Sequence, residues 1–411
     1  MKTYNTVIVG GGVSGVLAGI HLDDDKSIIL EKNSTLLKKI LVTGGGRCNI
    51  TNNNPLETYI QSYYNSGNYY RTAFNNFFNS DIIELLEKHG CKTKTEDDKR
   101  VFPVTDKATS VQKTLIEILD NTKTNYQLNT NVTSITREDD FFLITYNNGH
   151  LIKSENIILS TGGDSYPETG SDGSGYKLAV KLGHSITEHM GGLSPIETYE
   201  NWVRKLSGIS IDAKITIKAD KKKISTTNSS IMFTHNGLSG HAVLDNSMLI
   251  ENHLRQNHNV KLELDLAKDY NHEQLDQKLL DDFKEHPTWG LKRYMHEYMP
   301  KSMVTTILKQ LEIKEDTKLN QVSKKDRYKI RDNLKRLEFT VKSVQDKHRM
   351  VTNSGVRQDQ INPNTMESRL VDNLYFTGEL IEGCGMCGGF NLQKAYSTGV
   401  LAATTIKGVK R

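Results

Sequence analysis

The chain has 411 residues, and its 53 Lys and Arg nearly balance its 49 Asp and Glu, which gives a formal net charge of +4. Hydrophobic residues make up 36% and charged residues 25%, values that fit a soluble globular protein and exclude a disordered tail or a polybasic arm. Four cysteines are too few for a disulfide framework, and no apolar run approaches the length of a membrane span. The apolar stretch at 6–9 is too short for a signal peptide, so we expect a cytoplasmic protein.

The first predicted elements form a βαβ unit. Residues 3–10 favour a buried strand because they contain Val7, Ile8 and Val9, and three glycines end it. A helix-like segment with Val16 and Ile20 follows, and residues 27–30 predict a second strand that ends at Glu31.

The next elements are read from their periodicity. Residues 52–120 predict mostly helix, and residues 127–158 predict a hairpin and a further strand, with a turn at 147–149. In the middle of the chain, alternating strands near 209–217 and a turn at 221–223 precede several stretches of helical spacing, the last with Ile330, Leu334 and Leu337. The run NLYF at 373–376 predicts a final strand.

The sequence Gly10-x-Gly12-x-x-Gly15 stands between the first strand and the first helix, which is the context that makes this motif informative. The first glycine permits the tight turn, the second lets the backbone approach a pyrophosphate, and the third lets helix and strand pack closely. Glu31 stands where an acid would accept bonds from a ribose and oppose a 2′-phosphate. The motif predicts a dinucleotide site, but it serves FAD and NAD equally well.

Three further glycine-containing segments indicate one extended cofactor held along its length. They lie at 39–52, where three glycines precede Arg47, and at the strand ends 158–165 and 376–379. Between residues 193 and 354 only four glycines occur.

The chain resembles a bacterial flavoprotein family that is variously called BaiN-like, aminoacetone oxidase-like or NAD(FAD)-utilizing dehydrogenase. The segments that carry the resemblance span almost the whole chain and include GGGVSG at 10–15, KKILVTGGGRCNITN at 38–52, STGGDSYPETGSDGSGYKLA at 160–179 and FTGELIEGCGMCGGFNLQKAYSTG at 376–399.

The resemblance implies an α/β fold with a two-dinucleotide-binding-type (glutathione-reductase-like) FAD domain, which is interrupted by an inserted β-barrel plus helical domain. We therefore expect a discontinuous FAD domain at 1–192 and 355–411. The glycine-poor segment 193–354 is the expected insert, β-rich over 193–265 and helical over 266–340.

The family pattern also implies which residues bind FAD. Gly10 to Gly15 would hold the pyrophosphate, Glu31 the ribose and the backbone at Val132 the adenine, while the later segments would approach the flavin. The full set of expected cofactor-binding residues is Gly10, Gly12, Val13, Ser14, Gly15, Glu31, Lys32, Thr43, Gly44, Gly46, Arg47, Cys48, Asn49, Val132, Thr161, Gly162, Gly163, Gly378, Glu379, Gly388, Gly389, Phe390, Asn391 and Leu392.

One departure from the family pattern creates a pair of cysteines, Cys384-Gly-Met-Cys387, in a loop expected near the flavin. A CxxC pair beside a flavin could exchange electrons as dithiol and disulfide, whereas packing of small residues is the alternative. A metal is not expected, because zinc needs about four ligands and no second pair has suitable spacing. No other catalytic residue is indicated.

The function expected from these features is that of an FAD-dependent oxidoreductase acting on a small molecule. The resemblance implies either an oxidase for small amines or a reductase that uses NAD(P)H, and the sequence does not separate them. Because no second GxGxxG follows a strand after residue 160, NAD(P)H would bind only transiently. An RNA-directed flavoprotein with a +6 insert and a thiol oxidoreductase are the alternatives; a nucleic acid or membrane partner is not expected, and the oligomeric state is left open.

Overall fold

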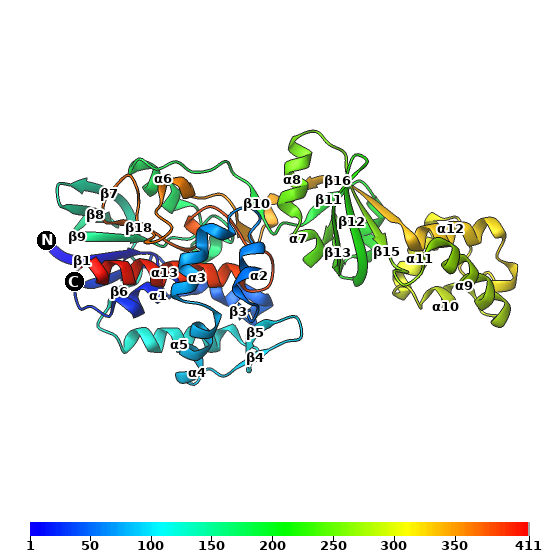
Figure 1. Ribbon diagram of the computed structural model, residues 1–411, viewed down its shortest axis with the longest axis horizontal. Helices are drawn as coiled ribbons and strands as arrows, with labels where there is room; N and C mark the ends of the chain where they lie inside the picture. The colour runs from blue at the N-terminus through cyan, green and yellow to red at the C-terminus, as the bar shows by residue number, and fades with distance from the viewer. Residues whose placement is uncertain (410–411) are drawn as a thin grey trace. The chain divides into compact units, whose positions relative to one another are not determined.

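The computed structural model describes residues 1–409. The chain forms two compact units, which we call unit 1 (Met1–Gly191 and Met350–Arg411) and unit 2 (Gly192–Arg349) (Figure 1). The short strands β10 (Gly191–Gly192) and β17 (Val351–Thr352) lie near the points where the chain passes between the units. Within residues 1–409, no helix combines the length and the hydropathy that crossing a membrane requires.

A seven-stranded sheet forms the centre of unit 1. Its order is β6 (Asn125–Gln127), β2 (Ser27–Leu30), β1 (Lys2–Val9), β9 (His150–Leu159), β8 (Phe141–Tyr146) and β7 (Val132–Glu138), with β18 (Leu374–Phe376) also paired to β9. The strand β1 runs parallel to both β2 and β9. Val7 and Ile8 are fully buried, as expected for a strand covered on both faces.

The predicted turn at 147–149 is confirmed, because β8 ends at Tyr146 and β9 begins at His150. The strands β7, β8 and the first half of β9 form an antiparallel meander. On its other edge β9 pairs in parallel with β1 from Ile152 to Leu159, and Ile157 to Leu159 also pair in parallel with β18, so one strand joins the meander to the parallel part of the sheet.

In unit 1, helix α1 (Val13–Leu22) packs against both α5 (Ala108–Asp120) and α13 (Phe390–Val409). The remaining helices of unit 1 are α2 (Leu56–Gln61), α3 (Arg71–Asn76), α4 (Asn79–Lys88) and α6 (Ser174–Lys181). The segment 52–120 is less helical than the sequence predicts, because β4 (Thr93–Thr95) and β5 (Arg100–Pro103) pair with β3 (Thr51–Asn52) in a small antiparallel sheet. The pairing depends on a distant strand, so periodicity within the segment does not reveal it.

Unit 2 contains a closed barrel, which confirms the β-barrel of the predicted fold. The strand order is β11 (Ile196–Thr198), β14 (Gly237–Ser239), β13 (Lys222–Phe233), β12 (Ser210–Ala219), β15 (Val260–Asp265) and β16 (Leu337–Val344). Alternate residues such as Ile215, Ile217, Leu262 and Leu264 are fully buried. The helices α7 (His241–Leu244) and α8 (Ser247–Arg255) lie between strands β14 and β15 in the sequence.

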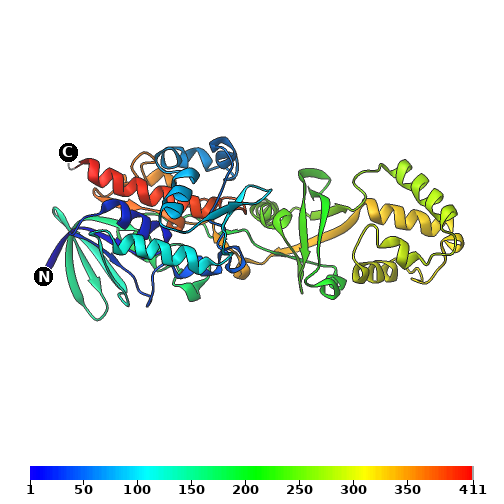
Figure 2. The same cartoon turned by 90° about the horizontal axis from the view of Figure 1, so that it is seen from below.

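The helical part of unit 2 comprises α9 (His272–Glu285), α10 (Leu291–Met295), α11 (Lys301–Gln310) and α12 (Lys324–Lys335), gathered beyond one end of the barrel (Figures 1 and 2). The helical segment expected over 266–340 ends at Lys335 in the structure. Leu337, which the sequence assigns to the last helical pattern, begins β16 instead. Leu337 fits both patterns, since it continues the spacing of Leu334 and also alternates with the buried Phe339.

Candidate functional site

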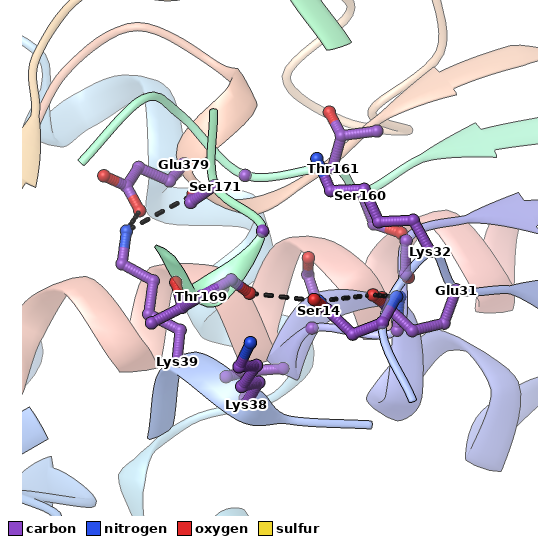
Figure 3. Close-up of a pocket in the computed structure, with 18 of the residues that line it drawn as sticks. Ser14, Glu31, Lys32, Lys38, Lys39, Ser160, Thr161, Thr169, Ser171 and Glu379 are labelled. Carbon is purple, nitrogen blue, oxygen red and sulfur yellow. Dashed lines mark hydrogen bonds and ion pairs between the residues drawn. The ribbon is translucent and has the colours of Figure 1, made fainter. Parts of the chain in front are cut away.

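A cavity in unit 1 lies at the carboxyl ends of β1, β2 and β9, the edge where open α/β sheets bind ligands (Figure 3). It contains about 1270 Å³ of empty space, part of it open to solvent. The loops after these strands, the start of α1, the turn at Lys38 to Thr43 and the start of α13 line it. The site is therefore extended, because its lining comes from segments that are far apart in the sequence.

The glycine turn after β1 is shaped by its neighbours. Gly10 has a φ of +106°, and a Cβ added there would lie 2.6 Å from the carbonyl oxygen of Ser160. A Cβ at Gly15 would lie 2.0 Å from the carbonyl oxygen of Gly10, so α1 packs directly against the turn. At Gly12 the nearest atom would be 3.9 Å away, which leaves this backbone open to the cavity.

The N-terminus of α1 meets the cavity without a side-chain cap. Gly12 is the N-cap residue, the first turn holds no acidic residue, and Val13 and Ser14 line the cavity. The first amide groups of a helix lack internal partners, and the helix dipole adds a partial positive charge there. The arrangement therefore suits a pyrophosphate.

Glu31 is 6% exposed at the end of β2, and two main-chain amides hold its carboxylate in place. Oε2 accepts from the N–H of Gly11 at 2.6 Å, and Oε1 accepts from the N–H of Asn33 at 2.7 Å. Oε1 also accepts from Asn33 Nδ2 at 2.7 Å, so Oε2 is the oxygen that keeps a lone pair for a further donor, such as a ribose hydroxyl. The neighbouring Lys32 forms an ion pair with Asp172 at 2.7 Å.

A polar network spans another part of the cavity. Lys39 Nζ lies 2.6 Å from Glu379 Oε2 (Figure 3). It also lies 2.7 Å from Ser165 Oγ. Glu379 Oε1 accepts from the Ser165 hydroxyl and from the N–H of Thr352. Although burial raises the pKa of Glu379, the charge and hydrogen bond of Lys39 and the other two donors outweigh it and lower the pKa. Glu379 is therefore held as a carboxylate.

Lys394 is a further cation on the cavity wall, and it is buried. Its ammonium donates to the carbonyl oxygens of Ile381 at 2.7 Å and Gly383 at 2.5 Å, and lies 4.8 Å from the centroid of the Tyr70 ring. Burial lowers its pKa to about 8, against weaker opposing effects of nearby acidic groups. Lys394 thereby fixes the chain that leads into the cysteine loop.

The structure brings only part of the predicted cofactor-binding set to the cavity wall. The predicted residues that line it are Gly10, Gly12, Val13, Ser14, Glu31, Lys32, Thr43, Val132, Thr161, Gly162, Glu379, Asn391 and Leu392. The predicted residues outside the lining are Gly15, Gly44, Gly46, Arg47, Cys48, Asn49, Gly163, Gly378, Gly388, Gly389 and Phe390.

Arg47 shows why a residue in a family motif can lie outside the lining. Its Nη2 lies 2.6 Å from both Glu96 and Asp106, and its guanidinium carbon is 3.9 Å from the centroid of the Phe102 ring. The side chain thus bonds to protein carboxylates that are distant in sequence. The adjacent Cys48 is fully buried, and burial raises the pKa of its thiol to about 12, so it is held as a neutral thiol.

The cysteine loop is anchored at several points. Asn391 accepts from the N–H of Gly385 at 2.8 Å and donates to the carbonyl oxygen of Gly385 at the same distance. Cys384 is buried and Cys387 is partly exposed, and neither residue lines the cavity. A redox role for the pair remains a prediction.

Sequence reasoning missed several residues that line the cavity, most notably its charged groups. They include Lys38, Lys39 and Lys394, together with Ser160, Ser171 and Met350. All three lysines lie in segments that carry the family resemblance. Their position in those segments was the signal that could have identified them as lining residues.

The glycine turn, the uncapped helix and the anchored Glu31 fit the pyrophosphate and ribose of FAD, and fold and site together define an FAD-binding flavoprotein. The chain belongs to the HI0933-like family, because the family's HI0933-like protein Rossmann domain matches residues 4–405. This membership confirms the resemblance found in the sequence.

Two relatives match the chain over nearly its full length. A 3-dehydro-bile acid delta(4,6)-reductase of Clostridium scindens is 28% identical, over 96% of this chain and 97% of its own. A ribosomal RNA dihydrouridine synthase of Escherichia coli is 26% identical, over 97% and 96%. Among solved structures, a flavocytochrome c3 fumarate reductase has a TM-score of 0.52 at 15% identity and covers 99% of this chain and 78% of its own, which supports the fold alone. The chain is an FAD-dependent oxidoreductase.

Proposed function

We propose that the protein is a reductase that takes electrons from NAD(P)H and saturates a carbon–carbon double bond conjugated to a carbonyl group. The observation that carries this proposal is the chemistry shared by the names of two relatives that match over nearly the full length. A 3-dehydro delta(4,6) bile acid has double bonds conjugated to a 3-keto group, and dihydrouridine is uridine whose double bond next to a carbonyl is saturated. One reaction type thus accounts for both.

In this proposal, the main chain of the Gly10 to Gly15 turn and the first amides of α1 bind the pyrophosphate of FAD. The anchored carboxylate of Glu31 accepts the ribose hydroxyls, and the backbone at Val132 meets the adenine. Each of these groups has the required polarity and lines the cavity or shapes the turn beside it.

Lys39 and Glu379 would bind toward the flavin end of the cofactor. Because the two side chains form an ion pair, they add little net charge to the cavity. They would offer the cofactor one hydrogen-bond donor and one acceptor without a strong electrostatic field. Ser165 and the N–H of Thr352 fix the carboxylate from its other oxygen, which holds the pair in one geometry.

When bound and reduced by NAD(P)H, FAD would supply the hydride that this reduction requires, and a proton from solvent would complete the saturated bond. The sequence contains no second glycine motif after a strand beyond residue 160 that could hold a nicotinamide dinucleotide permanently. NAD(P)H and the acceptor would therefore use the same open side of the site in turn, which predicts ping-pong kinetics.

The test is anaerobic mixing of the purified FAD-bound protein with NADH, with NADPH and with small primary amines. Bleaching of the flavin absorbance by a nicotinamide donor, followed by its recovery when a cyclic conjugated enone is added, supports the proposal. Bleaching by an amine with recovery only on admission of oxygen would contradict it and identify an amine oxidase.

A further inference from the structure

The positive charge of unit 2 is concentrated in its helical part. Unit 2 contains 28 Lys and Arg and 22 Asp and Glu, a net charge of +6. Residues 301–336 alone contain eleven Lys and Arg and five Asp and Glu, which is also +6. The rest of unit 2 is therefore neutral in sum, and the excess of positive charge lies within residues 301–336.

The start of this segment lines an open pocket between α10 and α11, with about 1040 Å³ of empty space that is partly open to solvent. Lys292, Arg293, His296 and Lys301 line it, with Glu315 and Asp316 at the same site. Glu315 pairs with Lys292 at 2.9 Å. In the part of the chain that the structure describes, no carboxylate pairs with Arg293 or Lys301, and both residues are exposed. The pocket thus offers two cations to an anionic ligand.

His296 supports this view of the pocket. Desolvation lowers its pKa, and the positive charges of Lys301 and Lys292 lower it further. The pocket is therefore electropositive at the position of this ring. An anion there would relieve the repulsion, as a phosphate group commonly does in basic clefts.

An aromatic stack adjoins the pocket. The rings of His286 and Trp289 lie parallel, with centroids 3.9 Å apart and planes inclined by 4°. The guanidinium carbon of Arg293 lies 4.0 Å from the centroid of the Trp289 ring. Arg293 therefore belongs both to the stack and to the pocket wall. Proteins bind single-stranded and looped RNA with planar side chains beside cations. The bases stack on the planar groups, and the phosphates bind to the positive charges.

We propose that this site binds RNA, with a backbone phosphate at Arg293 and Lys301 and a base or ribose against the His286–Trp289–Arg293 stack. The inference deepens the proposed function and rests on it, since it makes the conjugated acceptor a uridine in RNA. The name of the Escherichia coli relative agrees with this acceptor. An open pocket beside a stacked indole favours RNA over an anionic membrane, which requires charge but no planar surface.

The test is fluorescence anisotropy of the full-length FAD-bound protein with a fluorescein-labelled RNA hairpin whose loop contains uridine, over a series of salt concentrations. Arg293→Glu with Lys301→Glu removes the phosphate contacts, and Trp289→Ala removes the stack. Lys222→Glu with Lys223→Glu is the matched control, because it makes the same charge change on exposed residues of the barrel hairpin. Thermal unfolding and the flavin spectrum check that each variant is folded.

We expect the Arg293 and Lys301 pair to lose about tenfold or more in affinity, and the salt slope to fall by about 1 for each phosphate contact removed. Trp289→Ala should lose about fivefold or more. The control pair should lose much less. Equal losses in both charge-reversed pairs would overturn the site and leave only general electrostatic attraction.

Three further outcomes separate this inference from the proposed function. Binding to vesicles that contain phosphatidylserine, without binding to RNA, would overturn the inference in favour of a membrane surface. Reduction of a small conjugated enone by a protein that does not bind RNA would overturn the inference and leave the reductase intact. RNA binding at this site without any reduction by NAD(P)H would support the site and contradict the reductase.

Discussion

Lys39 and Glu379 form an ion pair of 2.6 Å although 340 residues separate them in the chain. The pair connects the segment after β2 to the segment after β18, and both segments form part of the cavity wall. Both side chains are largely shielded, with 24% and 19% exposure. This contact links the stability of unit 1 to the shape of its cofactor site.

Glu379→Gln should destabilise unit 1, because it keeps the size of the side chain and leaves the Lys39 cation without its partner. We expect a loss of about 2 kcal/mol, below the values for fully buried pairs since both groups retain some exposure. Chemical unfolding of the protein without cofactor measures it. In the Lys39→Met background the same substitution should cost less, and equal costs in both backgrounds would show that the pair contributes nothing.

The same pair predicts a pH dependence. Because the pKa of Glu379 is lower in the folded state, the unfolded chain takes up the proton first as the pH falls. The contribution of the Glu379 carboxylate to the free energy of unfolding is complete above its usual pKa of 4.5. It is lost as the pH falls through the lower pKa that Glu379 has in the folded protein. The stability difference between the wild type and Glu379→Gln should therefore be constant near neutral pH and shrink in acid. A difference that grows in acid would contradict this sign.

Gly12→Glu should abolish FAD binding while the fold is retained. The added side chain would extend into the open space at Gly12, where it would occupy the pyrophosphate position and repel its charge. Equilibrium dialysis against FAD measures the loss. Gly408→Glu is the matched control, because it makes the same change at an exposed helix position where an added Cβ meets no atom within 4 Å. Normal FAD affinity in Gly12→Glu would refute the assignment of the turn.

Lys394→Met should destabilise the segment that leads into the cysteine loop. The substitution removes the donor that the carbonyl oxygens of Ile381 and Gly383 share, and an unsatisfied buried carbonyl costs about 1–3 kcal/mol. Hydrogen exchange should show faster exchange at 381–389 than in the wild type. Lys407→Met, at an exposed position of the same helix, should leave this segment unchanged. Unaltered exchange in Lys394→Met would show that the lysine does not hold the loop.

Cys384 and Cys387 should keep their thiol state when the flavin is reduced, because neither residue lines the cavity. Thiol titration of the denatured protein, before and after anaerobic reduction of the bound flavin, measures this. The Cys384→Ser and Cys387→Ser double variant should retain reduction of a conjugated enone. A gain of two thiols on reduction, lost in the double variant, would establish the dithiol mechanism instead.

The parts of the site that sequence predicts are those fixed by local geometry. The glycine turn and the acid at Glu31 follow from a strand, a turn and a second strand within the first 31 residues. The contacts of Lys39 and Lys394 could not be predicted in this way, because Glu379 is distant from Lys39 in sequence and main-chain carbonyls carry no sequence signal. Arg47 lies outside the cavity lining for the same reason, since Glu96 and Asp106 approach it through the fold.

The fold shows the same limit. The closed barrel requires β16, which lies after the helical part in sequence, and Leu337 satisfies the helical and strand patterns equally. The small sheet of β3, β4 and β5 likewise depends on pairing between separate segments. Family resemblance supplied the β-barrel that periodicity alone did not resolve.

The most direct test of the central claim is a double-mixing experiment without oxygen. The FAD-bound protein is first reduced with one equivalent of NADPH or NADH, and is then mixed with a cyclic conjugated enone or with the corresponding isolated alkene. The account predicts rapid reoxidation of the flavin by the enone, with formation of the saturated ketone, and none by the alkene. Failure of both nicotinamides to reduce the flavin, or reoxidation by oxygen but not by the enone, would contradict it.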